Sequence, residues 1–432
     1  MPTVSFRTLG CKLNQAETAV LQEQFAEKGY RLVPWGEPSD VSVLNTCTVT
    51  SRSDSKCRQA IHHVLSLHPD TTVIVVGCYS QVAPEELERL SGVDYVFGTH
   101  DKFGLFAHFS KPGKRSKPLV VVSPVHRPIA EVFRSTGASS GHTRAFLKIQ
   151  SGCSRSCAYC IVPAARGPGR SLPLEAIVRQ AGALIRRGFR EIVLTGTHIG
   201  DFGKDLVGRS LLPDLIQAVG ALEGLGRIRL SSLDPEDVGS SFLDSVVSNP
   251  NVCRHFHLSM QSGSDAVLHA MNRTYTTSAF RDVVEKLAGT LGPVGLGADV
   301  ITGFPGESDT LFEETRLCIE SLPFTYLHVF PFSPRNGTKA ASMPNQISPN
   351  QRMQRADILR RLASQKHQRF QGQWIGRTVE VLMEGKNRDG WMSGLSSEYV
   401  RVEVPYDPSW INRIVTVHVE RAAGLGLRGS VV

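Results

Sequence analysis

Hydrophobic and polar positions along the first hundred residues follow a repeating strand-then-helix pattern. Short apolar runs typical of buried strands are each followed by a longer stretch with helical periodicity. Strands are expected at Val4–Leu9, Val41–Asn45 and Val73–Val76, and helices at Gln15–Lys28 and Ser51–Leu67. Repeats of this kind predict a parallel sheet with helical crossovers.

The same pattern resumes between about Ala145 and Ala340. Strands are expected at Phe146–Gln150, Glu191–Leu194, Ile228–Ser231, His255–Met260, Gly297–Ile301 and Tyr326–Phe330. The helical stretches between them include Leu174–Arg187, Leu211–Glu223, Phe280–Leu287 and Thr310–Ser321. These units predict a partial (β/α)6 barrel, which carries its chemistry on the loops after the strands. Polar, glycine-rich turns are expected to face its mouth at Thr195–Thr197, Ser232–Asp234, Gln261–Gly263 and Gly303–Glu307.

The last sixty residues change to short alternating strands. Runs at Thr378–Met383, Tyr399–Val404 and Ile414–Val419, separated by turn signals, predict a small β-barrel of a size that often binds RNA. A helix expected at Pro349–Gly372 precedes it. The basic residues of this helix are Arg352, Arg355, Arg360, Arg361, Lys366 and Arg369. They are interpreted either as phosphate contacts or as a solvated helix face.

The expected fold class is therefore α/β, with three folded parts and two connections. We expect an N-terminal parallel α/β domain at 1–110, a linker at 111–144 and the partial barrel at 145–345. A basic connecting helix at 346–372 and the small β-barrel at 373–432 complete the chain. The linker begins with a basic run, interpreted as a solvated face or part of an RNA path: Lys111, Lys114, Arg115 and Lys117.

Composition adds a cellular context. No run of eighteen apolar residues occurs and the N-terminus lacks the features of a signal peptide, so we expect a cytoplasmic protein with no membrane association. In that compartment nine cysteines favour metal binding or catalysis over disulfides. The net charge of +8 is modest support for a polyanionic partner.

Three cysteines in the loop after the first barrel strand are the strongest chemical signal. Cys153, Cys157 and Cys160 are close enough to bind one metal centre, and three thiolates leave the fourth iron of a 4Fe-4S cluster open for a reactant. The alternatives are a zinc site or three buried thiols. Zinc would need a fourth Cys or His nearby, and none follows within the next thirty residues.

Three further cysteines follow the three N-terminal strands. Cys11, Cys47 and Cys78 occupy equivalent places after strands of one parallel sheet, where ligands gather at the carboxyl ends. Two interpretations stay open at this level: a second three-ligand metal site, or three small buried residues. Cys57, Cys253 and Cys318 have no cysteine neighbour at ligand spacing and are interpreted as core or surface thiols.

The Cys-x3-Cys-x2-Cys spacing, with Tyr159 before its last cysteine, resembles the signature of the radical S-adenosylmethionine (SAM) superfamily. The whole chain resembles the methylthiotransferase family within it. The resemblance rests on TLGCKLNQAET, NTCTVT, VGCYSQ, KIQSGCSRSCAYCIVPAARG, LTGTHIGDFG, HLSMQSGSDAVLHAMNRTY, DVITGFPGESDTLFEET and HVFPFSPRNGTKA. Three positions depart from the family pattern, namely Ser151, Leu172 and Phe202.

This resemblance implies two 4Fe-4S clusters, with Cys11, Cys47 and Cys78 binding the auxiliary one, and SAM at the other. It also implies that the last domain is an RNA-binding TRAM domain. We hypothesise that Tyr159, Thr195, Gly196 and Gln261 lie near SAM.

The opening GCKLNQAET resembles the subgroup that adds a methylthio group to carbon 2 of threonylcarbamoyladenosine, next to the tRNA anticodon. In the mechanism that this implies, one SAM methylates sulfur at the auxiliary cluster and a second is reductively cleaved. The implied partners are the tRNA anticodon stem-loop and an electron donor such as flavodoxin or ferredoxin. The alternatives are methylthiolation of isopentenyladenosine or of a ribosomal protein, and, in another class, a non-catalytic iron-sulfur RNA-binding protein.

Overall fold

The computed structural model describes residues 1–125, 143–424 and 426–432, and its first part is a six-stranded parallel sheet in the order β2-β1-β3-β4-β5-β6. Strands β3 and β4 are buried along their whole length, which is why they read as continuous apolar runs. The elements are β1 (Thr3–Thr8), α1 (Lys12–Glu27), β2 (Arg31–Val33), β3 (Val41–Thr46), α2 (Ser51–Leu67), β4 (Thr72–Gly77), α3 (Cys78–Val82), α4 (Pro84–Glu88), β5 (Val93–Phe97), η1 (Asp101–Ala107) and β6 (Leu119–Val121).

The beginning of the predicted linker is tied to this sheet. Lys114 forms an ion pair of 2.6 Å with the buried Asp94, and the guanidinium of Arg115 lies 5.2 Å from the ring centroid of Tyr95. These two cations therefore form neither a solvated face nor part of an RNA path. The sequence did not reveal this, because Asp94 and Tyr95 come close to Lys114 and Arg115 only in the folded protein. Residues 126–142 of the predicted linker lie outside the described residues.

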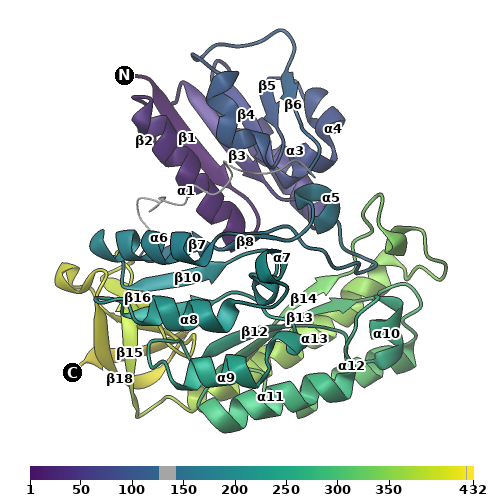
Figure 1. The fold of residues 1–432 in the computed structure, drawn as a ribbon, viewed down its shortest axis with the longest axis vertical. Coiled ribbons are helices and arrows are strands. Elements are labelled where there is room, and N and C mark those ends of the chain that lie inside the picture. Colours follow the sequence, from purple (N-terminus) through teal and green to yellow (C-terminus); the bar gives the residue numbers. More distant parts are fainter. Residues whose placement is uncertain (126–142, 425) are drawn as a thin grey trace.

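The central part consists of two parallel three-stranded sheets, β11-β10-β7 and β12-β13-β14. Parallel bridges from Ile228 to Val252 and from Leu233 to Leu258 join the two sheets into one open arc, which Figure 1 shows below the N-terminal sheet. The strands are β7 (Arg144–Lys148), β10 (Glu191–Thr195), β11 (Arg227–Leu230), β12 (His255–Gln261), β13 (Gly295–Thr302) and β14 (Tyr326–Pro331). The other elements are β8 (Gln150–Ser151), α5 (Val162–Arg166), β9 (Arg170–Ser171), α6 (Leu174–Arg186), η2 (Ile199–Asp201), α7 (Lys204–Val207), α8 (Leu212–Gly220), η3 (Pro235–Asp237), α9 (Ser240–Val247), α10 (Asp265–Ala270), α11 (Thr277–Leu291), α12 (Asp309–Ser321) and η4 (Lys339–Ala341).

The two faces of these central strands differ sharply. Apolar residues such as Leu147, Leu194 and Leu258 pack outward in the largest hydrophobic core, together with residues of α6, α8, α9, α11 and α12. Successive strand residues point to opposite faces, so the residues between them line the inside of the arc. That inner face carries Lys148, Arg229, His257 and Asp299 among others, and its polarity distinguishes it from a filled barrel core.

The C-terminal part is a closed five-stranded barrel in the order β15-β16-β17-β19-β18. It packs on the amino ends of the central strands, where Arg227 donates to the backbone carbonyls of Leu395 and Glu380, and Arg229 donates to those of Ser396 and Ser397. Its elements are β15 (Thr378–Met383), β16 (Trp391–Ser396), β17 (Arg401–Pro405), η5 (Pro408–Trp410), β18 (Ile414–Ala423) and β19 (Gly426–Val431). This arrangement confirms the predicted fold class.

The predicted basic helix exists as α13 (Pro349–Gly372), but neither interpretation of its charges holds for all of them. Arg352 and Arg355 are buried against the barrel: Arg352 donates to the Phe332 carbonyl at 3.1 Å, and Arg355 pairs with Glu307 at 2.8 Å. Lys366 donates to the Leu322 carbonyl at 2.6 Å. These cations hold the helix in place. The sequence could not show this, because the acceptors of their hydrogen bonds lie elsewhere in the chain.

No helix in the described ranges is long and apolar enough to cross a membrane.

The N-terminal domain is joined to the barrel by a buried ion cluster around Glu17 of α1. Its carboxylate accepts from Lys102 at 2.6 Å, Lys148 at 2.8 Å and Arg166 at 2.9 Å. Lys148 lies on β7 and Arg166 on α5, so the cluster spans both domains. On the other side of the interface the buried Arg335 pairs with Asp54 of α2 at 2.6 Å. The two domains are therefore held in one relative orientation.

We expect Glu17→Gln to lower the free energy of unfolding by at least about 3 kcal/mol, because three buried cations would lose their only shared carboxylate. Denaturant unfolding of the purified protein measures this. The control is Glu320→Gln, which breaks an exposed ion pair with Arg316 on α12 and should change stability by less than about 1 kcal/mol. Equal small effects of both substitutions would contradict the structural role of the cluster.

Candidate metal centres

The loop between β8 and α5 holds Cys153, Cys157 and Cys160, all half-buried. A tight turn brings two of them together, because the amide of Cys160 donates to the carbonyl of Cys157 at 3.1 Å. Burial, with smaller contributions from the other two thiols, raises the pKa of Cys160 to about 12. Gly152 before the turn has φ +80°, and a Cβ there would lie 2.0 Å from the Pro168 carbonyl oxygen, so only glycine fits.

Neighbouring charges hold this cysteine loop. Arg273 donates to Cys157 Sγ at 3.1 Å and pairs with Asp234, in the loop after β11, at 2.7 Å. Arg155, inside the loop, pairs with Glu236 and lies 3.6 Å from Asp234. These contacts fix the cysteine loop against the loop after β11.

Cys11, Cys47 and Cys78 also meet, at the carboxyl ends of β1, β3 and β4. Burial raises the pKa of Cys47 to about 12, and the charges of Cys78 and Cys11 add to the shift, which places the three sulfurs in one neighbourhood. Gly10 has φ +108°, and a Cβ there would lie 2.6 Å from Cys47 Cβ. The backbone before Cys11 therefore packs directly on Cys47.

In neither cysteine trio do all three sulfurs lie within 4.8 Å of one another. Within the described ranges, two groups of three His, Cys, Asp or Glu ligand atoms lie within 4.8 Å of one another, and neither contains a cysteine. Tetrahedral zinc with bonds of 2.3 Å would bring its sulfurs to about 3.8 Å. Cys57 supplies no fourth ligand, because it is buried in the sheet core and its thiol donates to the Cys47 carbonyl. Three thiols without a fourth ligand fit a 4Fe-4S cluster with one open iron.

The ion cluster around Glu17 lies beside the N-terminal trio. Arg166 and Lys102 both lower the pKa of the Cys78 thiol, although burial raises it more. Three cations share one carboxylate here, and burial lowers the pKa of Lys148 to about 8. Anionic thiolates next to this excess of positive charge would balance it, so the surroundings fit a thiolate-bound group at this site.

The four predicted SAM contacts come from three segments at the carboxyl end of the barrel. Tyr159 belongs to the cysteine loop, where it packs against a small core that includes Phe304, and burial raises its pKa well above the usual range. Thr195 ends β10 and is buried, and Gly196 lies against Gln150. Gln261 ends β12 with φ 63°. Their contact with SAM stays a prediction.

Two glycines of the glycine-rich turns pack closely against helices. A Cβ on Gly263 would lie 2.8 Å from Cys318 Cβ of α12, and one on Gly303 would lie 2.3 Å from Cγ of Arg352 of α13. Close packing is therefore one reason for glycine at these two positions, and the expectation that the turns face one mouth stays a prediction.

Sequence reasoning missed several functional candidates. Arg166 and Glu17 carried no local signal, since they pair with each other across two domains. The polar inner face of the barrel at His257 and Asp299 could have been predicted in part. In HFHLSMQ, histidines alternate with apolar residues, which indicates a strand with one polar face. His198 after β10 was also missed: its ring contacts Asp201 at 2.7 Å and Asp237 at 2.9 Å.

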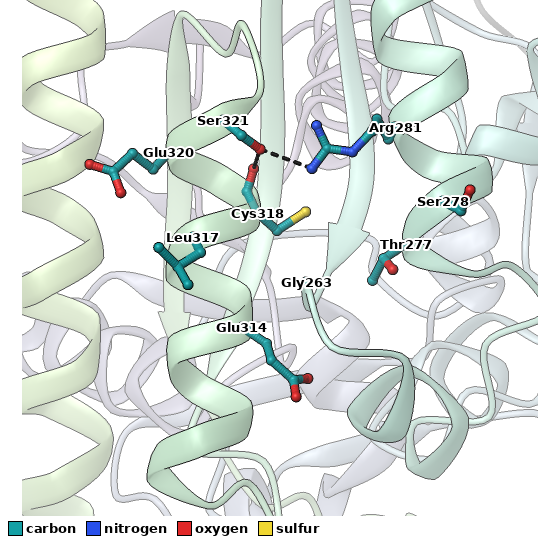
Figure 2. A pocket seen from close by; sticks show the side chains of 9 residues that line it. All are labelled: Gly263, Thr277, Ser278, Arg281, Glu314, Leu317, Cys318, Glu320 and Ser321. Atoms are coloured by element: carbon teal, nitrogen blue, oxygen red, sulfur yellow. Dashed lines mark hydrogen bonds between the residues drawn. The ribbon is translucent and has the colours of Figure 1, made fainter.

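A surface pocket of about 680 Å³ lies on the outside of the barrel, between α11 and α12. Figure 2 shows Arg281, Cys318 and Ser321 around it, with Arg281 donating to the Ser321 hydroxyl. None of the six clustered cysteines lines it. The pocket is therefore separate from the candidate centres.

Comparisons with known proteins cover all three parts of the chain. Residues 3–98 match the model of uncharacterized protein family UPF0004, 147–319 the radical SAM superfamily and 373–432 the TRAM domain. The threonylcarbamoyladenosine tRNA methylthiotransferase MtaB of Bacillus subtilis is 35% identical over 98% of this chain and 94% of its own length. A tRNA-2-methylthio-N(6)-dimethylallyladenosine synthase of Alkaliphilus oremlandii is 30% identical over 98% of this chain and 92% of its own.

A solved structure also resembles the chain. The radical S-adenosylmethionine methyltransferase TsrM from Kitasatospora setae aligns with a TM-score of 0.55 at 15% identity, over 79% of this chain and 77% of that one. At that identity the likeness concerns the fold alone.

We expect the ring of His198 to titrate near pH 9. Burial acts to lower its pKa, but hydrogen bonds from the ring to Asp201 and Asp237 outweigh burial and raise the pKa to about 9. Because the folded pKa is raised, the stabilising contribution is complete below the unfolded value of about 6.5 and is lost as pH rises through 9. NMR titration of the ring and thermal unfolding between pH 6 and 10 measure this. In His198→Asn this part of the pH dependence should disappear; a ring that titrates near 6.5 would contradict the assignment.

Proposed function

Because the chain belongs to the radical SAM tRNA methylthiotransferase family, we propose that it adds a methylthio group to carbon 2 of threonylcarbamoyladenosine in tRNA. The observation that carries this is similarity over nearly the whole chain to relatives named for that activity, at 34% to 38% identity. Relatives named for the dimethylallyl substrate match at 30% to 31%. The enzyme uses SAM and iron-sulfur chemistry.

We further propose two separate 4Fe-4S clusters. Cys153, Cys157 and Cys160 would hold the one that binds SAM, and Cys11, Cys47 and Cys78 the auxiliary one. What supports this is the meeting of each trio in the fold, the lack of a nearby fourth cysteine ligand such as Cys57, and the cations next to each trio. When bound, these groups supply the electron, the hydrogen-abstracting radical and the sulfur that side chains cannot provide.

The residues of the chain would position and shield this chemistry. Arg273 orients Cys157, and Arg166 with Glu17 fixes the cysteine loop relative to α1, whose first turn begins at Cys11. The C-terminal barrel closes the amino end of the arc: Tyr399 stacks on His255 with ring centroids 4.1 Å apart, which excludes water from that end. The four positions Tyr159, Thr195, Gly196 and Gln261 stay our candidates for SAM contact.

The proposed partners follow from the same family. tRNA is the substrate, and the anticodon stem-loop is the proposed recognition element, since the TRAM domain is of a type that binds RNA. A small electron-transfer protein such as flavodoxin or ferredoxin is the proposed electron donor. Neither proposal depends on the basic helix α13, where Arg355 and Lys366 contact the barrel.

Anaerobically reconstituted protein should convert threonylcarbamoyladenosine in tRNA to its 2-methylthio derivative in the presence of SAM and dithionite. Mass spectrometry of digested tRNA detects the product, and tRNA bearing dimethylallyladenosine and ribosomal peptides serve as rival substrates. Product on either rival alone would contradict the proposed substrate. Absence of 5′-deoxyadenosine under all conditions would favour a non-catalytic RNA-binding protein.

The two trios should differ in their effects. Wild-type protein should contain about eight irons per chain, and Cys157→Ala and Cys47→Ala about four each. We expect Cys157→Ala to abolish 5′-deoxyadenosine formation, whereas Cys47→Ala should retain much of it but form no methylthio product. Cys57→Ala is the matched control, because this thiol packs in the core beside Cys47 without belonging to a trio, and iron content should not change. Equal loss of both activities in both trio variants would overturn the division of labour.

A further inference from the structure

Two side chains on the inner face of β14 stay open to solvent. Their neighbours Leu327 and Val329 pack outward against the largest hydrophobic core, so the alternating residues His328 and Phe330 point into the arc. Phe330 keeps 43% of its exposure, and the His328 side chain keeps 56%. An aromatic ring and an imidazole therefore lie side by side on a face that a ligand can reach.

Phe330 lies near the carboxyl end of its strand. Its register partner on β13 is Ile301, and each of the two is one residue before the end of its strand. Gln261, at the end of β12, lies opposite Val300, the residue before Ile301. Chemistry in barrels of this type takes place at this end of the strands. The exposed ring thus lies at the level of Gln261, one of the candidates for SAM contact.

His328 lies two residues before Phe330, about 7 Å farther from that end. The two rings are 6.4 Å apart and nearly perpendicular, at 75°. Asp299, the register partner of His328 on β13, lies 3.3 Å from His328 Nδ1 and 3.0 Å from His257 Nε2. The Tyr326 hydroxyl in turn lies 2.9 Å from His257 Nδ1. These polar groups form one connected row next to the aromatic ring.

This row determines which nitrogen of His328 is available. Burial acts to raise the pKa of Asp299, but hydrogen bonds from His257 and His328 hold it well below its usual range. An ionised carboxylate only accepts hydrogen bonds, so His328 Nδ1 carries the proton, and Nε2 of the neutral ring is an acceptor. Within the described ranges no residue donates to this Nε2. A ligand with an N–H or O–H group would find a positioned acceptor here.

The proposed substrate carries such donors on the substituent that distinguishes it. Threonylcarbamoyladenosine has on N6 a urea group followed by the hydroxyl and carboxylate of threonine, whereas the dimethylallyl group is apolar. Four bonds separate N6 from the carboxylate carbon, which is about 5 Å in an extended chain. This reach is close to the offset of about 7 Å between Phe330 and His328. A base stacked on Phe330 would therefore bring its N6 substituent to His328.

We propose that the inner face of β14 is the nucleoside subsite, where the base stacks on Phe330 and His328 Nε2 accepts a hydrogen bond from the threonylcarbamoyl group. This rests on the proposed function, since it names the side chains that recognise that substrate. Aromatic stacking holds any base, so Phe330 contributes affinity. His328 is the specificity-determining residue, because an apolar substituent would desolvate its Nε2 without offering a donor.

The test measures dissociation constants of the anaerobically reconstituted full-length protein for one tRNA. The tRNA carries threonylcarbamoyladenosine, dimethylallyladenosine or unmodified adenosine at the target position. In His328→Leu we expect the preference for the threonylcarbamoyl over the unmodified tRNA to fall by about 3- to 10-fold, the size of one hydrogen bond. His328→Gln should recover part of this preference, because its amide oxygen can accept.

Phe330→Ala should have a different effect. It should weaken binding of all three tRNAs by a similar factor of about 5- to 100-fold, the size of one base–aromatic stack, and leave the preference among them unchanged. Phe330→Tyr keeps the ring and should bind like wild type.

His108→Leu is the matched control for the histidine. His108 is an exposed residue at the end of η1 in the N-terminal domain, and its ring also lies beside a phenylalanine, 6.1 Å from Phe97. This variant should keep the wild-type preference. Iron content should equal wild type in every variant used, and His328→Ala replaces His328→Leu if leucine lowers it.

Three results would overturn the proposal: a wild type without preference for the threonylcarbamoyl tRNA, a fully iron-loaded His328→Leu that keeps the wild-type preference, or a Phe330→Ala that binds all three tRNAs like wild type. The fate of the proposed function is read separately. If wild type forms no product from the threonylcarbamoyl tRNA, that function fails, while the dissociation constants still decide whether β14 binds the nucleoside.

Discussion

The buried carboxylate of Glu17 is the interaction on which the architecture depends. It binds cations from η1, β7 and α5 at 2.6 to 3.1 Å, and each bond has a defined direction. Apolar surfaces can slide over one another, but such bonds fix one arrangement. Because Glu17 follows Cys11 by six residues and Arg166 follows Cys160 by six, the same contact fixes the distance between the two cysteine trios. A reaction that uses both proposed clusters requires such a fixed distance between them.

The barrel strands carry polar side chains on the inner face of the arc. Their hydrophobic core lies outside the strands, under the helices, so the inner face is free to carry Lys, Arg, His and Asp side chains. The C-terminal barrel covers the amino end through Arg227 and Arg229. The N-terminal domain lies along the edge of the arc at β7. The other two domains thus each cover one side of the central strands.

Local signals predicted the secondary structure well where the chain itself supplies the physical cause. The bounds of α2 and α13 agree with the expected ranges because Thr50 and Ser348 cap their first turns with side-chain hydrogen bonds, which are encoded within three residues. The charges of Arg352, Arg355 and Lys366 on α13 were misread for the opposite reason. Whether Arg355 meets solvent, phosphate or Glu307 depends on a loop that lies over forty residues away in sequence.

The sequence by itself determined the kind of elements, their order and the six cysteines, because strand and helix periodicity and the spacing of ligands are local properties of a chain. It also carried the family motifs. Only the tertiary structure decided that Cys11, Cys47 and Cys78 meet, that Glu17 gathers three cations, and that Arg335 pairs with Asp54. These facts depend on contacts between residues from 31 to 281 positions apart, and their energies arise from burial that no local pattern records.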